Sequence, residues 1–380
     1  MNNNKSKKSI KRTSSIKKKP IKRTSSIKKK SRSSVKSRDS KKNKSPIKGG
    51  ANKIVNMVES NIMRKTKDED KKCAPSKKYE EGSCFTLKSL QDMANAYNRS
   101  VKTSKNKIII SDQKKPLLEQ LNDRLKKVCD DQLCWIKQDF INYAKDKHEL
   151  KYLTFRPTGP QGRFTWLNTT NINHVMKQYE KKYNDFKFLG AVPIDFDELP
   201  SLGIYNLDLD KYYDEGIHRF GIIFNTDEHY KSGAHWIAMF FDIKKYEIYF
   251  FDSYAKRPEK RIRTLVGRIS KWCNKKHYNL VIEPDDSFMA PKKKNNIEKQ
   301  EKTKILFNQN RKQFKNSECG VYSINFILRL LKGETFQQIV EQELPDDEVN
   351  KCRNVYFTFD DPTNINIIDD DDIDDFIGAN

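Results

Sequence analysis

Short apolar runs separated by polar turns dominate the middle of the chain. Segments 219–225, 235–242 and 246–252 are rich in Ile, Phe, Tyr and Met, and we predict that each forms a β-strand. Apolar residues then recur at helical spacing over 262–273, which predicts a helix packed against these strands. Tyr278–Glu283 has the composition of a further strand.

The last patterned part of the chain follows a charged segment at 292–304, which we expect to be a flexible loop. A short strand is predicted at 305–308. Val321, Ile324, Leu328 and Leu331 then mark a buried helix that ends at Gly333. Strands followed by helices predict an α+β fold for a core over 151–358.

Amphipathic stripes of helical spacing precede the predicted core. One stripe runs from Phe85 to Tyr97 behind Thr86, and another runs from Leu117 to Val128 behind Pro116. These stripes predict a helical N-terminal extension over 73–150, and a similar pattern predicts a helix over 172–179 within the core.

Both ends of the chain lack an apolar pattern. Residues 1–50 hold 20 Lys+Arg and one acidic residue, so about +19 of the net charge of +24 lies there. The sequence Ile-Lys-Arg-Thr-Ser-Ser-Ile-Lys-Lys-Lys occurs at 10–19 and again at 21–30. We predict a disordered basic tail over 1–60 with an 11-residue repeat, and an acidic C-terminal tail over 359–380.

The basic tail has three interpretations. It is a solvated tail that keeps the protein soluble, an electrostatic arm that binds DNA or RNA through residues 5–48, or a nuclear address. Phosphorylation of its Arg-Thr-Ser-Ser motifs would lower the charge and weaken binding to nucleic acid.

The seven cysteines are odd in number and irregular in spacing. We find no secretion signal and no run near the ~20 apolar residues that cross a membrane. These features favour a reducing compartment with mostly free thiols. We therefore expect no membrane partner. Four cysteines lie in the helical extension: Cys73, Cys84, Cys129 and Cys134. Their spacing suits structural zinc poorly, so we expect them to be buried thiols.

Cys319 and His235 are candidates for nucleophile and base. Cys319 lies where a loop becomes an apolar helix, and a helix N-terminus favours the thiolate. His235 alone of the six histidines starts a long apolar strand. Taken singly, Cys319 is equally well a small buried hydrophobic residue, and His235 a structural histidine.

Asp252 and Gln313 complete the set. Asp252 ends the strand that follows His235, where a short turn would bring the two together, and its carboxylate could orient the imidazole. A strand-end turn residue or a helix cap is the alternative role. Gln313, six residues before Cys319, could donate to the oxyanion of a tetrahedral intermediate. Two weaker candidates are Asn225, which could orient the site residues, and Trp236, which could cover His235.

The order His235, Asp252, Gln313, Cys319 resembles the Ulp1-like (papain-like) clan of cysteine proteases. Ala-His-Trp at 234–236, Phe-Asp-Ser at 251–253 and Ser-Glu-Cys-Gly at 317–320 carry the resemblance. Residues 188–196 look closer to the viral branch, with the African swine fever virus protease and its giant-virus relatives. The resemblance implies a His-Asp-Cys triad with an oxyanion glutamine and needs no metal or organic cofactor.

The resemblance also implies protein substrates cut after Gly-Gly-Xaa sites, because a narrow channel admits only residues without side chains. We therefore expect a cysteine endopeptidase that matures viral structural precursors, in the virion or the host cytoplasm. The alternatives are an isopeptidase for SUMO or ubiquitin-like proteins, and a non-enzymatic nucleic-acid-packaging protein. Ile47-Lys-Gly-Gly-Ala51 itself resembles a cleavage site, or is a plain linker.

Overall fold

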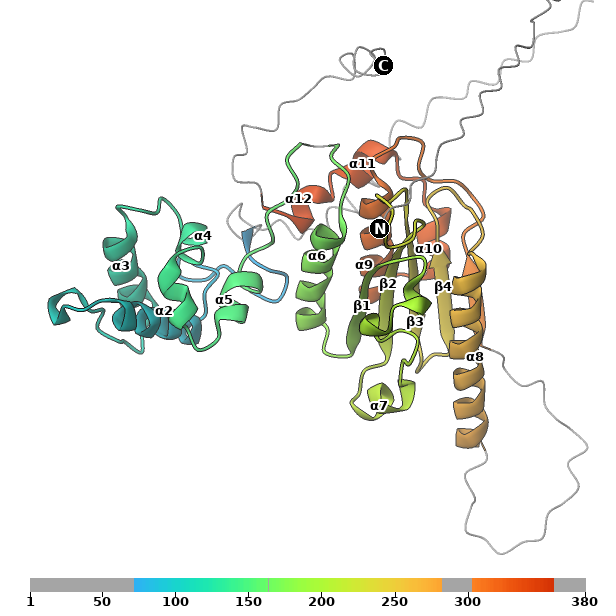
Figure 1. Cartoon of the computed structure of the whole chain (residues 1–380), viewed down its shortest axis with the longest axis horizontal. Helices are drawn as coiled ribbons and strands as arrows, with labels where there is room; N and C mark the ends of the chain where they lie inside the picture. The colour runs from blue at the N-terminus through green and yellow to red at the C-terminus, as the bar shows by residue number, and fades with distance from the viewer. Residues whose placement is uncertain (1–71, 163, 282–302, 359–380) are drawn as a thin grey trace, which may run out of the picture. The chain divides into compact units, whose positions relative to one another are not determined.

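The computed structural model describes residues 72–162, 164–281 and 303–358 (Figure 1). The predicted basic tail, most of the charged loop at 292–304 and the acidic C-terminal tail lie outside these residues. The Gly49-Gly50 junction lies outside them as well.

The core is built on a mixed β-sheet whose strands lie in sequence order, β1-β2-β3-β4-β5. The central strands β2, β3 and β4 pair antiparallel, whereas β1 pairs with β2 and β5 with β4 in parallel. The strands are β1 (Phe186–Pro193), β2 (Arg219–Asn225), β3 (Trp236–Asp242), β4 (Glu247–Phe251) and β5 (Lys304–Phe307).

Alternation of side chains along the strands gives the sheet two apolar faces. Ala238, Phe240 and Phe251 point into one hydrophobic cluster, which is covered by α6 (Thr169–Lys182) and α9 (Cys319–Leu331). Every residue of α9 is buried, because the helix passes through the centre of this cluster.

The other face of the sheet packs against a single long helix, α8 (Lys260–Val281), as Figure 1 shows. Ile237, Met239 and Phe241 of β3 join Ile262 and Leu265 of α8 in a second cluster. The sheet therefore lies between helical layers, and the ends of its strands are set by the packing of both faces.

Residues 72–155 form a separate hydrophobic cluster, which contains both predicted amphipathic stripes. Thr86 caps the first helix by accepting a hydrogen bond from the Ser89 N–H, as its position before the stripe predicts. The helices here are α2 (Leu87–Ser100), α3 (Lys114–Leu125), α4 (Gln132–Trp135) and α5 (Lys147–Tyr152), with short 3₁₀ turns at Ser104–Asn106 and Asp139–Tyr143.

Short helices complete the core and close the end of its chain. They are α7 (Leu209–Asp214), α10 (Phe336–Glu341), α11 (Asp346–Asn350) and α12 (Arg353–Tyr356), with 3₁₀ turns at Phe196–Glu198 and Pro200–Leu202.

The predictions of secondary structure are wrong in three places. Tyr278–Val281 continue α8 rather than forming a strand, because a short apolar run fits either structure and the preceding helix extends through it. Val128 lies beyond the end of α3 and is 64% exposed. Strand β1 was not predicted, since Gly190 and Pro193 interrupt its pattern and a bulge breaks its register after Phe188.

The expectation of free thiols in the helical extension is also wrong. Cys73 pairs with Cys84 and Cys129 with Cys134 in disulfides, because the fold brings their Cα atoms to 5.3 and 5.4 Å. The remaining cysteines are buried free thiols: Cys273, Cys319 and Cys352. Because four of the seven cysteines are paired, cysteine usage no longer favours a reducing compartment.

Within residues 72–162, 164–281 and 303–358, no helix is long and apolar enough to cross a membrane. The same residues hold no group of three or more His, Cys, Asp or Glu side chains arranged to bind a metal ion.

Candidate active site

The antiparallel pairing of β3 and β4 brings His235 and Asp252 together. His235 comes directly before β3 and Asp252 directly after β4, so both lie at the same end of these two antiparallel strands. His235 Nε2 lies 2.7 Å from Asp252 Oδ1. His235 is 7% exposed and Asp252 is 2% exposed, so this pair is shielded from water.

The surroundings of His235 favour its charged form. Burial opposes the charge, but hydrogen bonds with Asp252 and Cys319 outweigh burial and raise the pKa of His235 to about 9. Tyr254 stacks on the imidazole with ring centroids 4.5 Å apart. Because Nε2 faces Asp252, the Nδ1 atom is left for Cys319.

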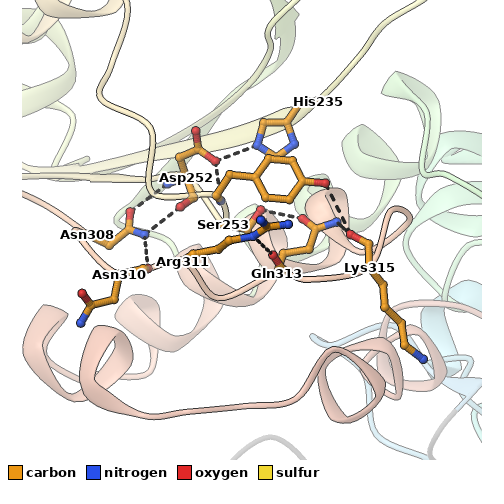
Figure 2. A network of polar contacts seen from close by, with 9 residues as sticks. His235, Asp252, Ser253, Asn308, Asn310, Arg311, Gln313 and Lys315 are labelled. Carbon is orange, nitrogen blue, oxygen red and sulfur yellow. Dashed lines mark hydrogen bonds and ion pairs between the residues drawn. The ribbon is translucent and has the colours of Figure 1, made fainter. Parts of the chain in front are cut away.

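Asn308 holds the backbone of Asp252 on both sides. Its Oδ1 accepts the Asp252 N–H at 2.9 Å, and its Nδ2 donates to the Asp252 carbonyl at 2.7 Å, as Figure 2 shows. The Asp252 carboxylate also accepts the Tyr254 N–H at 2.8 Å. Sequence reasoning missed Asn308, although a polar residue that ends the predicted strand at 305–308 was a usable signal.

Gln313 is fully buried, and its side-chain amide is held in one orientation. The Ser253 hydroxyl donates to Gln313 Oε1 at 2.7 Å, and Gln313 Nε2 donates to the Lys315 carbonyl at 2.8 Å (Figure 2). A primary amide carries two N–H donors, and the bond to Lys315 uses one of them.

Cys319 is the first residue of α9, as the sequence predicts, and is 3% exposed. The next residue, Gly320, lies close to Leu167, because a Cβ there would be 3.0 Å from Leu167 Cβ. The turn before Cys319 is held by buried Arg353, whose Nη2 donates to the Ser317 carbonyl at 3.1 Å. No pattern in the sequence singled out Arg353.

A cleft of about 300 Å³ lies beside the start of β3. Trp236 and Trp166 both line it, and the Trp236 indole N–H donates to the Leu167 carbonyl at 2.7 Å. Asn225 also lines the cleft, and its Oδ1 accepts the Ala234 N–H at 3.1 Å, so it fixes the backbone next to His235.

Comparison with known proteins shows the family of this chain. The model of the Ulp1 protease family, C-terminal catalytic domain, matches residues 221–363. A protein of Acanthamoeba polyphaga mimivirus that is named as a thiol protease is 37% identical over 301 residues, which cover 75% of this chain and 92% of the relative. The chain belongs to the Ulp1 protease family. It is therefore a thiol protease, and its family membership sets aside the non-enzymatic interpretation.

Viral proteases supply further relatives in the Ulp1 family. A protein of African swine fever virus named as a SUMO-1 cysteine protease is 24% identical over 250 residues, which cover 60% of this chain and 83% of the relative. A crystal structure of the African swine fever virus protease has a TM-score of 0.50 and 19% identity, and the match covers 76% of this chain and 96% of that one. This likeness shows the fold.

Proposed function

We propose that Cys319 is the nucleophile of this protease, with His235 as acid and base, Asp252 as the orienting carboxylate and Gln313 as the oxyanion donor. The observation that carries the proposal is the position of His235. Its Nε2 lies 2.7 Å from Asp252 Oδ1, and its imidazole also forms a hydrogen bond with Cys319. A base held between a carboxylate and a thiol is the arrangement that nucleophilic acyl transfer requires.

The proposed reaction starts from a charged imidazole, because the pKa of His235 is raised to about 9. The imidazole holds the proton of the Cys319 thiol, and the sulfur attacks the scissile carbonyl carbon. The oxyanion is stabilised by a Gln313 side-chain N–H and the Cys319 backbone N–H. The C–N bond breaks, the amine of the leaving segment departs with a proton from His235, and the acyl group stays on Cys319 as a thioester. A water then gives a proton to His235 and attacks the thioester, so that the C–S bond breaks and the Cys319 sulfur is released.

The proposed substrates are proteins cut after Gly-Gly. This choice rests on the resemblance to the family, and the cleft lined by Trp166 and Trp236 is the proposed place of the residues before the scissile bond. Relatives from two groups of large DNA viruses support viral structural precursors as the natural substrates. The name of the African swine fever virus relative refers to SUMO-1, and it supports a ubiquitin-like substrate as the second candidate.

Peptides and fusion proteins separate these two candidates. We expect cleavage of a Gly-Gly-Xaa peptide and of capsid precursors, with little activity on a fusion to SUMO or ubiquitin. Cys319→Ala and His235→Ala abolish cleavage, whereas Cys273→Ala, which removes another buried free thiol, retains it. Full activity of Cys319→Ala would refute the assignment of the nucleophile. Cleavage confined to the fusions would favour the isopeptidase.

The basic arm adds two further proposals for residues that the structure does not describe. Residues 5–48 bind DNA or RNA by charge, so affinity falls steeply as salt is raised. The enzyme releases this arm by cutting after Gly50 or Ala51. Intact mass tests the release: the arm is lost from the active enzyme and kept by Cys319→Ala. An arm retained by both proteins would leave 46–51 as a linker.

A further inference from the structure

Phe314 is a large aromatic residue that is 72% exposed, directly after Gln313 in the chain. A single exposed aromatic residue is ordinary on a protein surface. Phe314 differs because its backbone and its ring are both held in place.

Buried Asp346 fixes the backbone around Phe314. Asp346 Oδ2 accepts the N–H of Phe314 at 2.8 Å and the N–H of Lys315 at 2.6 Å. Its other oxygen accepts the Tyr322 hydroxyl at 2.9 Å, and Asp346 is 6% exposed. The loop that carries the exposed ring is thus anchored to α9 and α11, so little conformational entropy is left to lose when the ring binds a partner.

Arg311 holds the ring and connects it with His235. The guanidinium carbon lies 5.1 Å from the centroid of Phe314 and 4.9 Å from that of Tyr254, and Tyr254 stacks on His235. Arg311 Nε donates to the Gln313 carbonyl at 2.6 Å. A continuous stack of Phe314, Arg311, Tyr254 and His235 therefore runs from the solvent to the imidazole.

The proposed reaction determines which part of a substrate meets this stack. His235 must protonate the amine of the leaving segment, so that segment passes the imidazole. The cleft lined by Trp166 and Trp236, which the proposed function gives to the segment before the scissile bond, has no residue of 311–315 in its lining. The leaving segment is therefore the part of the substrate that meets Phe314.

Resting on the proposed function, we propose that Phe314 and Arg311 form a binding site for the residues that follow the scissile bond. The exposed ring and the planar guanidinium favour a large apolar or aromatic side chain. The charge of Arg311 disfavours lysine and arginine at the same position. Phe314 determines specificity in this proposal and takes no part in the bond-making steps.

Two reactions test this proposal, and both use a Gly-Gly segment before the reactive carbon. The first is labelling of Cys319 by a Gly-Gly vinyl sulfone, which carries no residues after the reactive carbon. The second is cleavage of a Gly-Gly peptide with a phenylalanine in the leaving segment. Phe314→Ala lowers the ratio of the cleavage rate to the labelling rate by about 10-fold, because the apolar side chain of the leaving segment loses the ring that covers it. This fold-change corresponds to about 1.4 kcal/mol of transition-state stabilisation. A peptide with only glycines after the site shows less than about a 2-fold change in this ratio.

Tyr205→Ala is the matched control. Tyr205 is 57% exposed and also lies beside an arginine, with Arg268 at 5.5 Å from its ring, but it contacts none of the site residues. Its ratio stays that of the wild type, and Phe314→Leu falls between Phe314→Ala and the wild type. Equal losses in labelling and in cleavage of both peptides, or no loss in any of them, would overturn the proposal. A wild-type enzyme that neither labels nor cleaves would instead refute the proposed function.

Discussion

Asp252→Asn tests the electrostatics of the site with the smallest change of shape. The amide oxygen can still accept a hydrogen bond from His235 Nε2, now 2.7 Å from Asp252 Oδ1, but the negative charge is gone. Burial then acts against the imidazolium with only Cys319 left to support it. We expect the pKa of His235 to fall by about 2 pH units.

The magnitude follows from the raised pKa of His235. The difference between about 9 and the ordinary 6.5 corresponds to about 3 kcal/mol, at about 1.4 kcal/mol per pH unit. Because the folded-state pKa is the higher one, this stabilisation is complete below about pH 6.5 and is lost as the pH rises to about 9. Asp252→Asn should remove most of this pH dependence.

Nuclear magnetic resonance of histidine-labelled protein measures the pKa directly. The chain has six histidines, and the signal of His235 is the one that disappears in His235→Ala. Urea unfolding at pH 6 and pH 9.5 gives the accompanying change in the free energy of unfolding. Asp195→Asn is the matched control, because it removes the carboxylate 2.6 Å from His229 Nδ1 and leaves His235 unchanged.

One result would refute this reasoning. If the pKa of His235 in Asp252→Asn stays within about half a pH unit of the wild type, Asp252 does not support the imidazolium. The carboxylate would then be a strand-end residue with a structural role.

Asn308→Ala lowers the free energy of unfolding by about 2–4 kcal/mol in urea, because the buried N–H and carbonyl of Asp252 lose their partners. Gly320→Ala lowers it by about 1–3 kcal/mol and slows alkylation of Cys319, because the added Cβ would crowd Leu167. Thiol titration in denaturant without reductant finds three free thiols per chain, and seven after reduction.

A control variant or a contradicting outcome accompanies each of these three predictions. Gly267→Ala is the control for Gly320, because its Cβ would meet nothing and it should raise stability by about 0.5–1 kcal/mol in the middle of α8. Wild-type stability in Asn308→Ala would mean that water replaces the lost hydrogen bonds. Seven free thiols before reduction would contradict the disulfides.

The sequence by itself determined the central strands, the buried helix that follows them and the four candidate site residues. Short apolar runs between polar turns predicted β2, β3 and β4, and the ends of adjacent antiparallel strands had to place His235 near Asp252. A thiol at the start of an apolar helix predicted the position of Cys319 at the beginning of α9. These are local signals, because each depends on the spacing of residues within one or two elements.

The tertiary structure alone decided the contacts between distant segments. Asn308 reaches Asp252 only because β5 pairs with β4, and Arg353 supports the turn before Cys319 only because α12 packs there. The disulfide between Cys73 and Cys84 likewise depends on how the backbone folds. Periodicity in a sequence reports which face of an element is buried, but it holds no record of which buried faces meet. The partners of the candidate residues, and the fixed exposed ring of Phe314, therefore required the fold.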